Sequence, residues 1–148
     1  MWLIETNVFQ MPQLHKHLNV SCNPFEEFQI ANLMTELKKL KAKKPTIGWK
    51  SSLPLLSRLL MFNGFREIDK TLNDFIRRLE HLAGNTSNEK IMDVVQHTVF
   101  QLNEIDEKRQ IIETSEREDL CEFIGKAARL AGLKTGSNED ITEGFRNW

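Results

Sequence analysis

The sequence predicts an all-α protein, a single domain built as a bundle of five or six helices. Apolar residues recur every three to four positions in several long segments, a period that a β-strand does not have. Turn-forming and helix-capping residues separate these segments. A chain of 148 residues can also form one hydrophobic core without metal or disulfide support. We therefore expect one domain over residues 1–148, with an N-terminal arm over 1–22, whose conformation the sequence does not indicate, and a helical core over 23–148.

The first helix is predicted to begin at Asn23, whose side chain can cap the helix ahead of Pro24 at the first helical position. The apolar positions that follow at helical spacing are Phe25, Phe28, Ala31, Met34, Leu37 and Leu40. Lysines at 38–44 suit the negative end of this helix. Pro45 and Gly48 then interrupt the pattern.

A short run over 53–62, LPLLSRLLMF, is apolar on most sides and is followed by Asn63-Gly64. We interpret it as a buried central helix that stops at this turn signal. A third helix is predicted over 66–83, because apolar residues follow helical spacing and Gly84 supplies a C-terminal cap. These apolar residues are Ile68, Leu72, Phe75, Ile76, Leu79 and Leu82.

Two more helices are predicted over 88–109 and 115–131, each opening with the spacing of a capping box, Thr86 with Glu89 and Ser115 with Glu118. Short connections make the helices 66–83, 88–109 and 115–131 antiparallel neighbours. Between the last two, Ile111 and Ile112 either continue the helix, fill the edge of the core or lie exposed in a turn. A weaker helical pattern over 137–148, with Ile141, Phe145 and Trp148, predicts a final helix that is docked on the domain.

The predicted core combines the inward positions of these helices. Its members are Phe28, Leu37, Leu56, Leu60, Leu72, Phe75, Ile76, Leu79, Val95, Val99, Leu102, Leu120, Phe123, Ile124 and Ala127.

The formal net charge of −1 hides a difference between the two halves of the chain. Residues 1–84 carry 12 Lys and Arg against 8 Asp and Glu, whereas residues 85–148 carry 8 against 13. The small total argues against nucleic-acid binding driven by phosphate neutralisation. Cys22 and Cys121 match no disulfide or metal pattern, and no signal peptide or stretch of about 20 apolar residues is present, so we expect a cytoplasmic protein with no membrane partner.

Acidic residues concentrate in the segment 104–122, which holds eight of them against the bases Lys108, Arg109 and Arg117. They are Glu104, Asp106, Glu107, Glu113, Glu116, Glu118, Asp119 and Glu122. We expect them to form an acidic face around exposed apolar groups such as Ile111 and Ile112, which would attract a basic protein partner and reject acidic ones. Ordinary solubility explains the same charges equally well.

An alternative reading gives four of these acids a catalytic role. Glu104 and Glu107 have E-x-x-E spacing, Glu116 and Asp119 have E-x-x-D spacing, and two antiparallel helices can direct such pairs at Mg²⁺. The arrangement resembles the motif of all-helical nucleoside triphosphate pyrophosphatases, and this resemblance implies a magnesium-dependent nucleotide hydrolase. Only eight residues separate the two pairs, fewer than that family places there, and both pairs flank a turn at the end of the bundle.

The segment 114–148, with TSEREDLCEFI and LAGLKTGSNEDITEGFRNW, looks like the ending of short bacterial helical proteins grouped as domains of unknown function. The resemblance covers about a quarter of the chain and implies no active site. Compact proteins of this type are often immunity or antitoxin-like binders. We therefore expect a non-enzymatic binding protein without a cofactor, which covers a basic partner with its acidic C-terminal half.

Overall fold

The computed structural model describes residues 23–148 except 83, 85 and 137, and this part of the chain is all-α. The helices are α1 (Pro24–Lys41), α2 (Pro45–Ser52), α3 (Leu55–Leu82), α4 (Asn88–Arg109) and α5 (Thr114–Leu130). The predicted fold class is therefore confirmed. The predicted five or six bundle helices are not matched, because the bundle consists of four long helices and the eight-residue α2 links two of them. The arm predicted over 1–22 lies outside the described residues.

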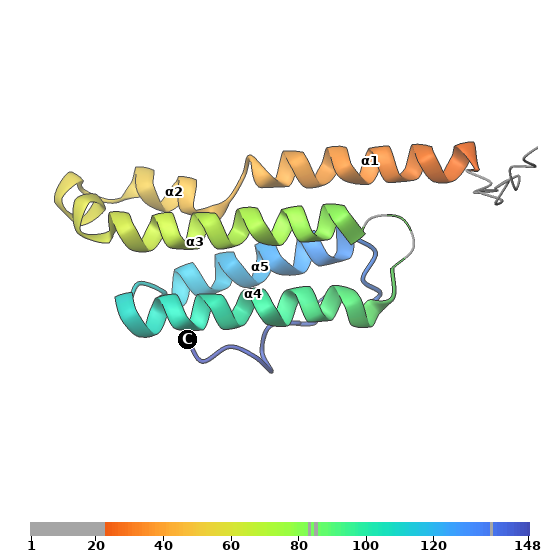
Figure 1. The fold of residues 1–148 in the computed structure, drawn as a ribbon. Coiled ribbons are helices and arrows are strands. Elements are labelled where there is room, and N and C mark those ends of the chain that lie inside the picture. The colour runs from red at the N-terminus through yellow and green to blue at the C-terminus, as the bar shows by residue number, and fades with distance from the viewer. Residues whose placement is uncertain (1–22, 83, 85, 137) are drawn as a thin grey trace, which may run out of the picture.

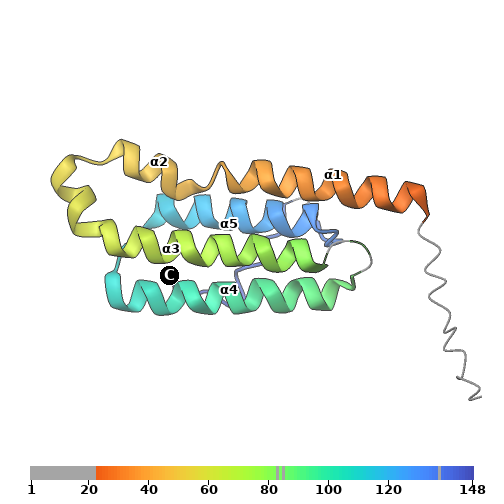
Figure 2. The same ribbon diagram turned by 45° about the horizontal axis from the view of Figure 1, so that its top comes forward.

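The four long helices lie side by side, and α2 continues along the same edge of the bundle as α1 (Figures 1 and 2). Helices α3, α4 and α5 follow one another with short connections, as predicted. Helix α1 packs against α3 and α5, and α2 also contacts both of these helices. Within the described residues, no helix is long and apolar enough to cross a membrane.

The core lies where the four long helices meet, and most of its predicted members are confirmed. These are Leu37, Leu72, Phe75, Ile76, Leu79, Val95, Val99, Leu102, Leu120, Phe123, Ile124 and Ala127, all buried. The predicted helices 66–83, 88–109 and 115–131 thus each bury the apolar face that the helical spacing of their residues predicted.

The prediction of a buried central helix over 53–62 is wrong. Leu56 and Leu60 are 69% and 78% exposed, and Phe28 near the start of α1 is also exposed. Helix α3 does not stop at Asn63-Gly64 but runs through both residues. Gly64 allows close packing there, because an added Cβ would lie 2.5 Å from the terminal methyl Cδ1 of Ile111.

Neither predicted capping box forms. Ser87 is the N-cap of α4, and its Oγ accepts a hydrogen bond from the backbone N–H of Lys90 at 3.5 Å, whereas the Thr86 hydroxyl donates to the carbonyl of Leu82. Helix α5 begins at Thr114, so Ser115 already lies inside it and donates to the Glu116 carboxylate at 3.1 Å. A hydroxyl caps only from a residue with non-helical backbone, and Ser115 does not meet that condition.

The end of α5 and the tail after it are held by backbone and side-chain hydrogen bonds. Gly132 has φ 105°, and the N–H groups of Gly132 and Leu133 donate to the carbonyls of Arg129 and Ala128, both at 3.0 Å. The final helix predicted over 137–148 is not formed, because residues 141–145 make turns instead. The tail is nevertheless docked, as expected, with Trp148 half-buried against the core.

Candidate binding surfaces

The α4–α5 turn uses one of the predicted acidic residues as a structural cap. Oδ1 of Asp106 accepts hydrogen bonds from the backbone N–H groups of Ile111 at 2.9 Å and Ile112 at 2.8 Å. Gln110, the residue before the two isoleucines, adopts a left-handed conformation with φ 50°. Both isoleucines are buried, so the alternative in which they fill the edge of the core is confirmed and the exposed one is wrong.

Three further acids of the predicted face bind neighbouring groups. Asp119 accepts a hydrogen bond from the Trp49 indole N–H at 2.8 Å, and Glu107 accepts one from the Asn147 amide at 3.3 Å. Glu116 accepts the hydrogen bond from Ser115 described above. These carboxylates help to hold α2, the C-terminal tail and the start of α5 in place.

Four acids of the set remain exposed, and their carboxylates form no hydrogen bond or ion pair with any described residue. They are Glu104, Glu113, Glu118 and Glu122. Glu118 and Glu122 lie one turn apart on the exposed side of α5, and Glu113 is the N-cap of the same helix. We call Glu113, Glu118 and Glu122 the acidic stripe. Glu104 lies on α4 and is not part of the acidic stripe.

Glu122 of the acidic stripe lines an open groove of about 710 Å³ between the α1–α2 connection and α5. The groove is lined on the α2 side by Ile47 and Trp49 and on the α5 side by Glu122, Phe123 and Lys126. Ile47 is exposed, whereas Trp49 and Phe123 are buried. The groove therefore combines apolar side chains with one free carboxylate, that of Glu122, and with the lysines Lys43, Lys44 and Lys126.

The four acids of the magnesium-site alternative are not brought together. In the described part of the chain, no group of three or more His, Cys, Asp or Glu side chains is close enough to hold a metal ion. Asp119 is bonded to Trp49, and Glu107 to the C-terminal tail. The spacing that resembles a pyrophosphatase motif therefore does not produce a shared ligand position here.

Most of the exposed large apolar side chains of the described residues lie at the start of α3, where the sequence predicted a core helix. We call residues 55–62 the α3 projection. Its exposed large side chains are Leu55, Leu56, Leu59, Leu60 and Phe62, each more than half exposed. A run that is apolar on most sides is typical of a buried helix, and therefore the sequence held no signal that it would lie at the surface.

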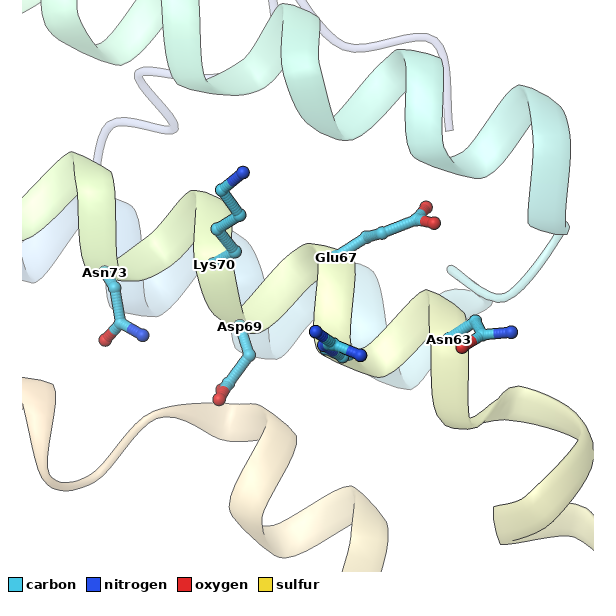
Figure 3. Close-up of a pocket in the computed structure, with 6 residues that line it drawn as sticks. Asn63, Glu67, Asp69, Lys70 and Asn73 are labelled. Atoms are coloured by element: carbon cyan, nitrogen blue, oxygen red, sulfur yellow. The ribbon is translucent and has the colours of Figure 1, made fainter.

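Polar residues follow the α3 projection along the same helix and line an open pocket of about 500 Å³ (Figure 3). In Figure 3, Asp69 points toward the α1–α2 segment and Glu67 points toward the end of α4. Asp69 accepts hydrogen bonds from the Thr46 hydroxyl and pairs with Lys44 Nζ at 3.1 Å, and Glu67 pairs with Arg109 at 2.8 Å.

These partners lower the pKa of both carboxylates of the pocket. Burial acts to raise the pKa of Asp69, but the hydrogen bonds from Thr46 and Lys44 outweigh it and leave the pKa below its ordinary value. The hydrogen bond from Arg109 lowers the pKa of Glu67. The remaining charged residues of the pocket, Arg66 and Lys70, form no ion pair with any described residue.

Cys121 is half-buried, and its Sγ lies 3.2 Å from the Thr142 hydroxyl. Burial raises the pKa of this thiol, so it stays protonated at neutral pH. This environment suits a structural cysteine rather than a nucleophile.

No protein-family model, curated protein or solved structure matches this chain.

Proposed function

We propose that the protein is a non-enzymatic binding module, an inhibitor of the immunity or antitoxin type that covers a basic protein partner. The observation that carries this proposal is the acidic stripe, in which Glu113, Glu118 and Glu122 are exposed and have no partner among the described residues. Acids that serve the fold, such as Asp106 and Asp119, are bonded to neighbouring groups instead.

Free carboxylates on one helix attract a positively charged surface over about 8–10 Å at physiological salt. Such a field increases the rate of association and disfavours acidic partners. The neighbouring groove adds apolar contact from Ile47 beside Glu122, and its own lysines, Lys43, Lys44 and Lys126, confine the attraction for a basic side chain to the Glu122 edge. A basic enzyme that acts on nucleic acids has the surface chemistry that suits this arrangement.

The test is a pull-down from a lysate of the source organism with wild-type protein and a stripe variant, Glu113→Lys with Glu118→Lys and Glu122→Lys. A control variant, Glu27→Lys with Glu89→Lys and Glu143→Lys, makes the same change in net charge at exposed positions elsewhere. We expect the stripe variant alone to lose a specifically retained basic protein. For the wild type, retention should fall steeply as salt rises.

Equal retention by the wild type and the stripe variant across the salt series would refute the electrostatic basis of the proposal. Loss of retention in both variants would show that overall charge matters rather than the stripe. Retention of an acidic protein through the stripe would contradict the partner chemistry.

A further inference from the structure

The α4–α5 turn meets α3 at Gly64 and Glu67, after the α3 projection, of which Met61 is partly buried against the core. Ile111 lies against Gly64, and Arg109 at the end of α4 pairs with Glu67. Residues 55–62 precede this contact and lie at the extreme end of the molecule, where they bend away from the axis of the rest of α3 (Figures 1 and 2). The five large apolar side chains of the α3 projection are therefore left at the surface.

A contiguous exposed apolar patch of this size marks a contact surface, since soluble monomers rarely leave several large leucine and phenylalanine side chains together in water. The leucines recur one turn apart, Leu55 with Leu59 and Leu56 with Leu60, so they form adjacent rows on the helix. Of residues 53–65, only Arg58 is charged.

The charges that flank the α3 projection in the sequence indicate which kind of partner covers it. Residues 37–66 contain eight bases and no acid. The bases are Lys38, Lys39, Lys41, Lys43, Lys44, Lys50, Arg58 and Arg66. The next acids on α3, Glu67 and Asp69, are already paired with Arg109 and Lys44.

Three bases close to the leucines remain without an ion pair among the described residues: Arg58, Arg66 and Lys70. Arg66 follows Phe62 by one helical turn, and Lys70 follows Arg66 by one more. The start of α3 therefore presents apolar side chains followed by free positive charges.

We propose that the α3 projection is a membrane-contact surface that binds an anionic lipid bilayer. Its leucines and Phe62 enter the interface between headgroups and acyl chains, while Arg58, Arg66 and Lys70 bind the phosphates of anionic lipids. This contact lies along the bilayer surface and requires no membrane-spanning helix. It therefore differs from our expectation of no membrane partner, which was based on the lack of a spanning segment. The proposal is independent of the acidic stripe on α5.

Other occupants fit these charges less well. Against the α3 projection of a second copy, Arg58 and Arg66 would face like charges and find no carboxylate. Residues 1–22 carry one acid, Glu5, together with one base, Lys16, so they offer little compensation for the free bases. An anionic lipid surface satisfies both the apolar and the positive groups. The α4–α5 turn lies at the same end of the molecule (Figure 1), and the exposed Glu113, the N-cap of α5, opposes the bilayer. We therefore expect binding to be reversible and sensitive to salt.

The test is co-sedimentation of the full chain with vesicles of phosphatidylcholine alone or of phosphatidylcholine with phosphatidylglycerol. We expect binding to the anionic vesicles and little to the neutral ones. Leu59→Gln should lower the partition constant about tenfold, because it replaces an inserted apolar side chain with a polar one. Arg66→Gln and Lys70→Gln should each lower it about fivefold, equivalent to about 1 kcal/mol per basic residue near an anionic surface.

The control variant, Arg78→Gln with Lys134→Gln, removes two exposed bases elsewhere and should bind within about twofold of wild type. Because Leu59 is exposed, Leu59→Gln should keep the wild-type circular dichroism spectrum and melting temperature. Equal binding to neutral and anionic vesicles, or equal loss in the control variant, would overturn the proposal.

Two results would assign the surface to another occupant and also overturn the proposal. One is the absence of vesicle binding together with a dimer mass in light scattering that Leu59→Gln reduces to a monomer. The other is a monomer that binds vesicles only after residues 1–22 are removed.

Discussion

The indole Nε1 of Trp49 donates a hydrogen bond to Oδ2 of Asp119 over 2.8 Å and so joins α2 to α5. Trp49 is only 7% exposed, and its ring also packs against Phe65 with a centroid distance of 5.9 Å. The pair thus fixes the short helix α2 onto two long helices. Asp119, which the sequence placed on an acidic binding face, is an acceptor that the fold requires.

Removing this acceptor is predicted to destabilise the protein. Asp119→Ala leaves the buried indole N–H without a partner and should lower the free energy of unfolding by about 1–3 kcal/mol in urea denaturation. Asp119→Asn keeps an acceptor oxygen and should lower the free energy of unfolding by a smaller amount. Glu118→Ala, at an exposed neighbouring position, is the control and should change stability by less than about 0.5 kcal/mol. Equal losses for Asp119→Ala and Glu118→Ala would contradict the role assigned to the hydrogen bond.

Gly64 and Ile111 are predicted to be energetically coupled. Alanine stabilises a helix by about 1 kcal/mol relative to glycine, but a Cβ at position 64 would lie 2.5 Å from Ile111 Cδ1. Gly64→Ala should therefore destabilise the wild type, as overpacking costs about 1–3 kcal/mol. The Ile111→Val variant lacks that methyl group. In this background, Gly64→Ala should raise the free energy of unfolding by about 1 kcal/mol.

A double-mutant cycle measured by thermal or urea denaturation gives this coupling directly. Gly48→Ala is a suitable control, because nothing lies within 4 Å of its added Cβ in α2, and it should stabilise in both backgrounds. If Gly64→Ala behaved like Gly48→Ala in the wild type, close packing would not be the reason for glycine at position 64.

Asp69 is predicted to make stability depend on pH in the acidic range. Its folded-state pKa lies below the ordinary value of about 3.9, so its contribution is complete above that pH and is lost as the pH falls through the folded-state pKa. Asp69→Asn should lower the free energy of unfolding by about 1 kcal/mol at neutral pH. This difference should shrink as the pH is lowered from about 5 to 2.

Asn73→Ala is the matched control for that series, because it removes a hydrogen-bond partner of Lys44 at 2.9 Å without removing a titrating group. Its effect on the free energy of unfolding should stay nearly constant over the same pH range. A difference between wild type and Asp69→Asn that does not change with pH would refute the assignment.

The amphipathic parts of the bundle were predictable because burial of one helix side is a local pattern. Leu72, Leu79, Val95 and Ile124 repeat with the helical period, and each of them is buried. Cap positions were less predictable, since Thr86 and Ser87 are adjacent and only the backbone conformation decides which hydroxyl serves α4.

The candidate site was predictable only in part, for a physical reason. Which carboxylates stay free depends on which buried donors the tertiary fold brings to them, and no spacing rule encodes that. Asp106 meets the N–H groups of the α4–α5 turn and Asp119 meets Trp49, whereas Glu118 and Glu122 meet none among the described residues. The α3 projection escaped prediction because hydrophobicity alone does not show where the neighbouring helices end.

A comparison of Leu60 with Leu72 tests whether the α3 projection is exposed in solution. The sequence predicted both in the core, Leu60 because its run is apolar on most sides and Leu72 because of helical spacing, but Leu60 is 78% exposed and Leu72 is fully buried. Leu72→Ala should lower the free energy of unfolding by about 2–5 kcal/mol, through lost apolar burial and the cavity that remains. Leu60→Ala should change it by less than about 0.5 kcal/mol when no lipid is present, because the side chain is mostly hydrated in both states. Urea denaturation of both variants measures this difference, and a loss above about 2 kcal/mol for Leu60→Ala would mean that the start of α3 is buried in solution.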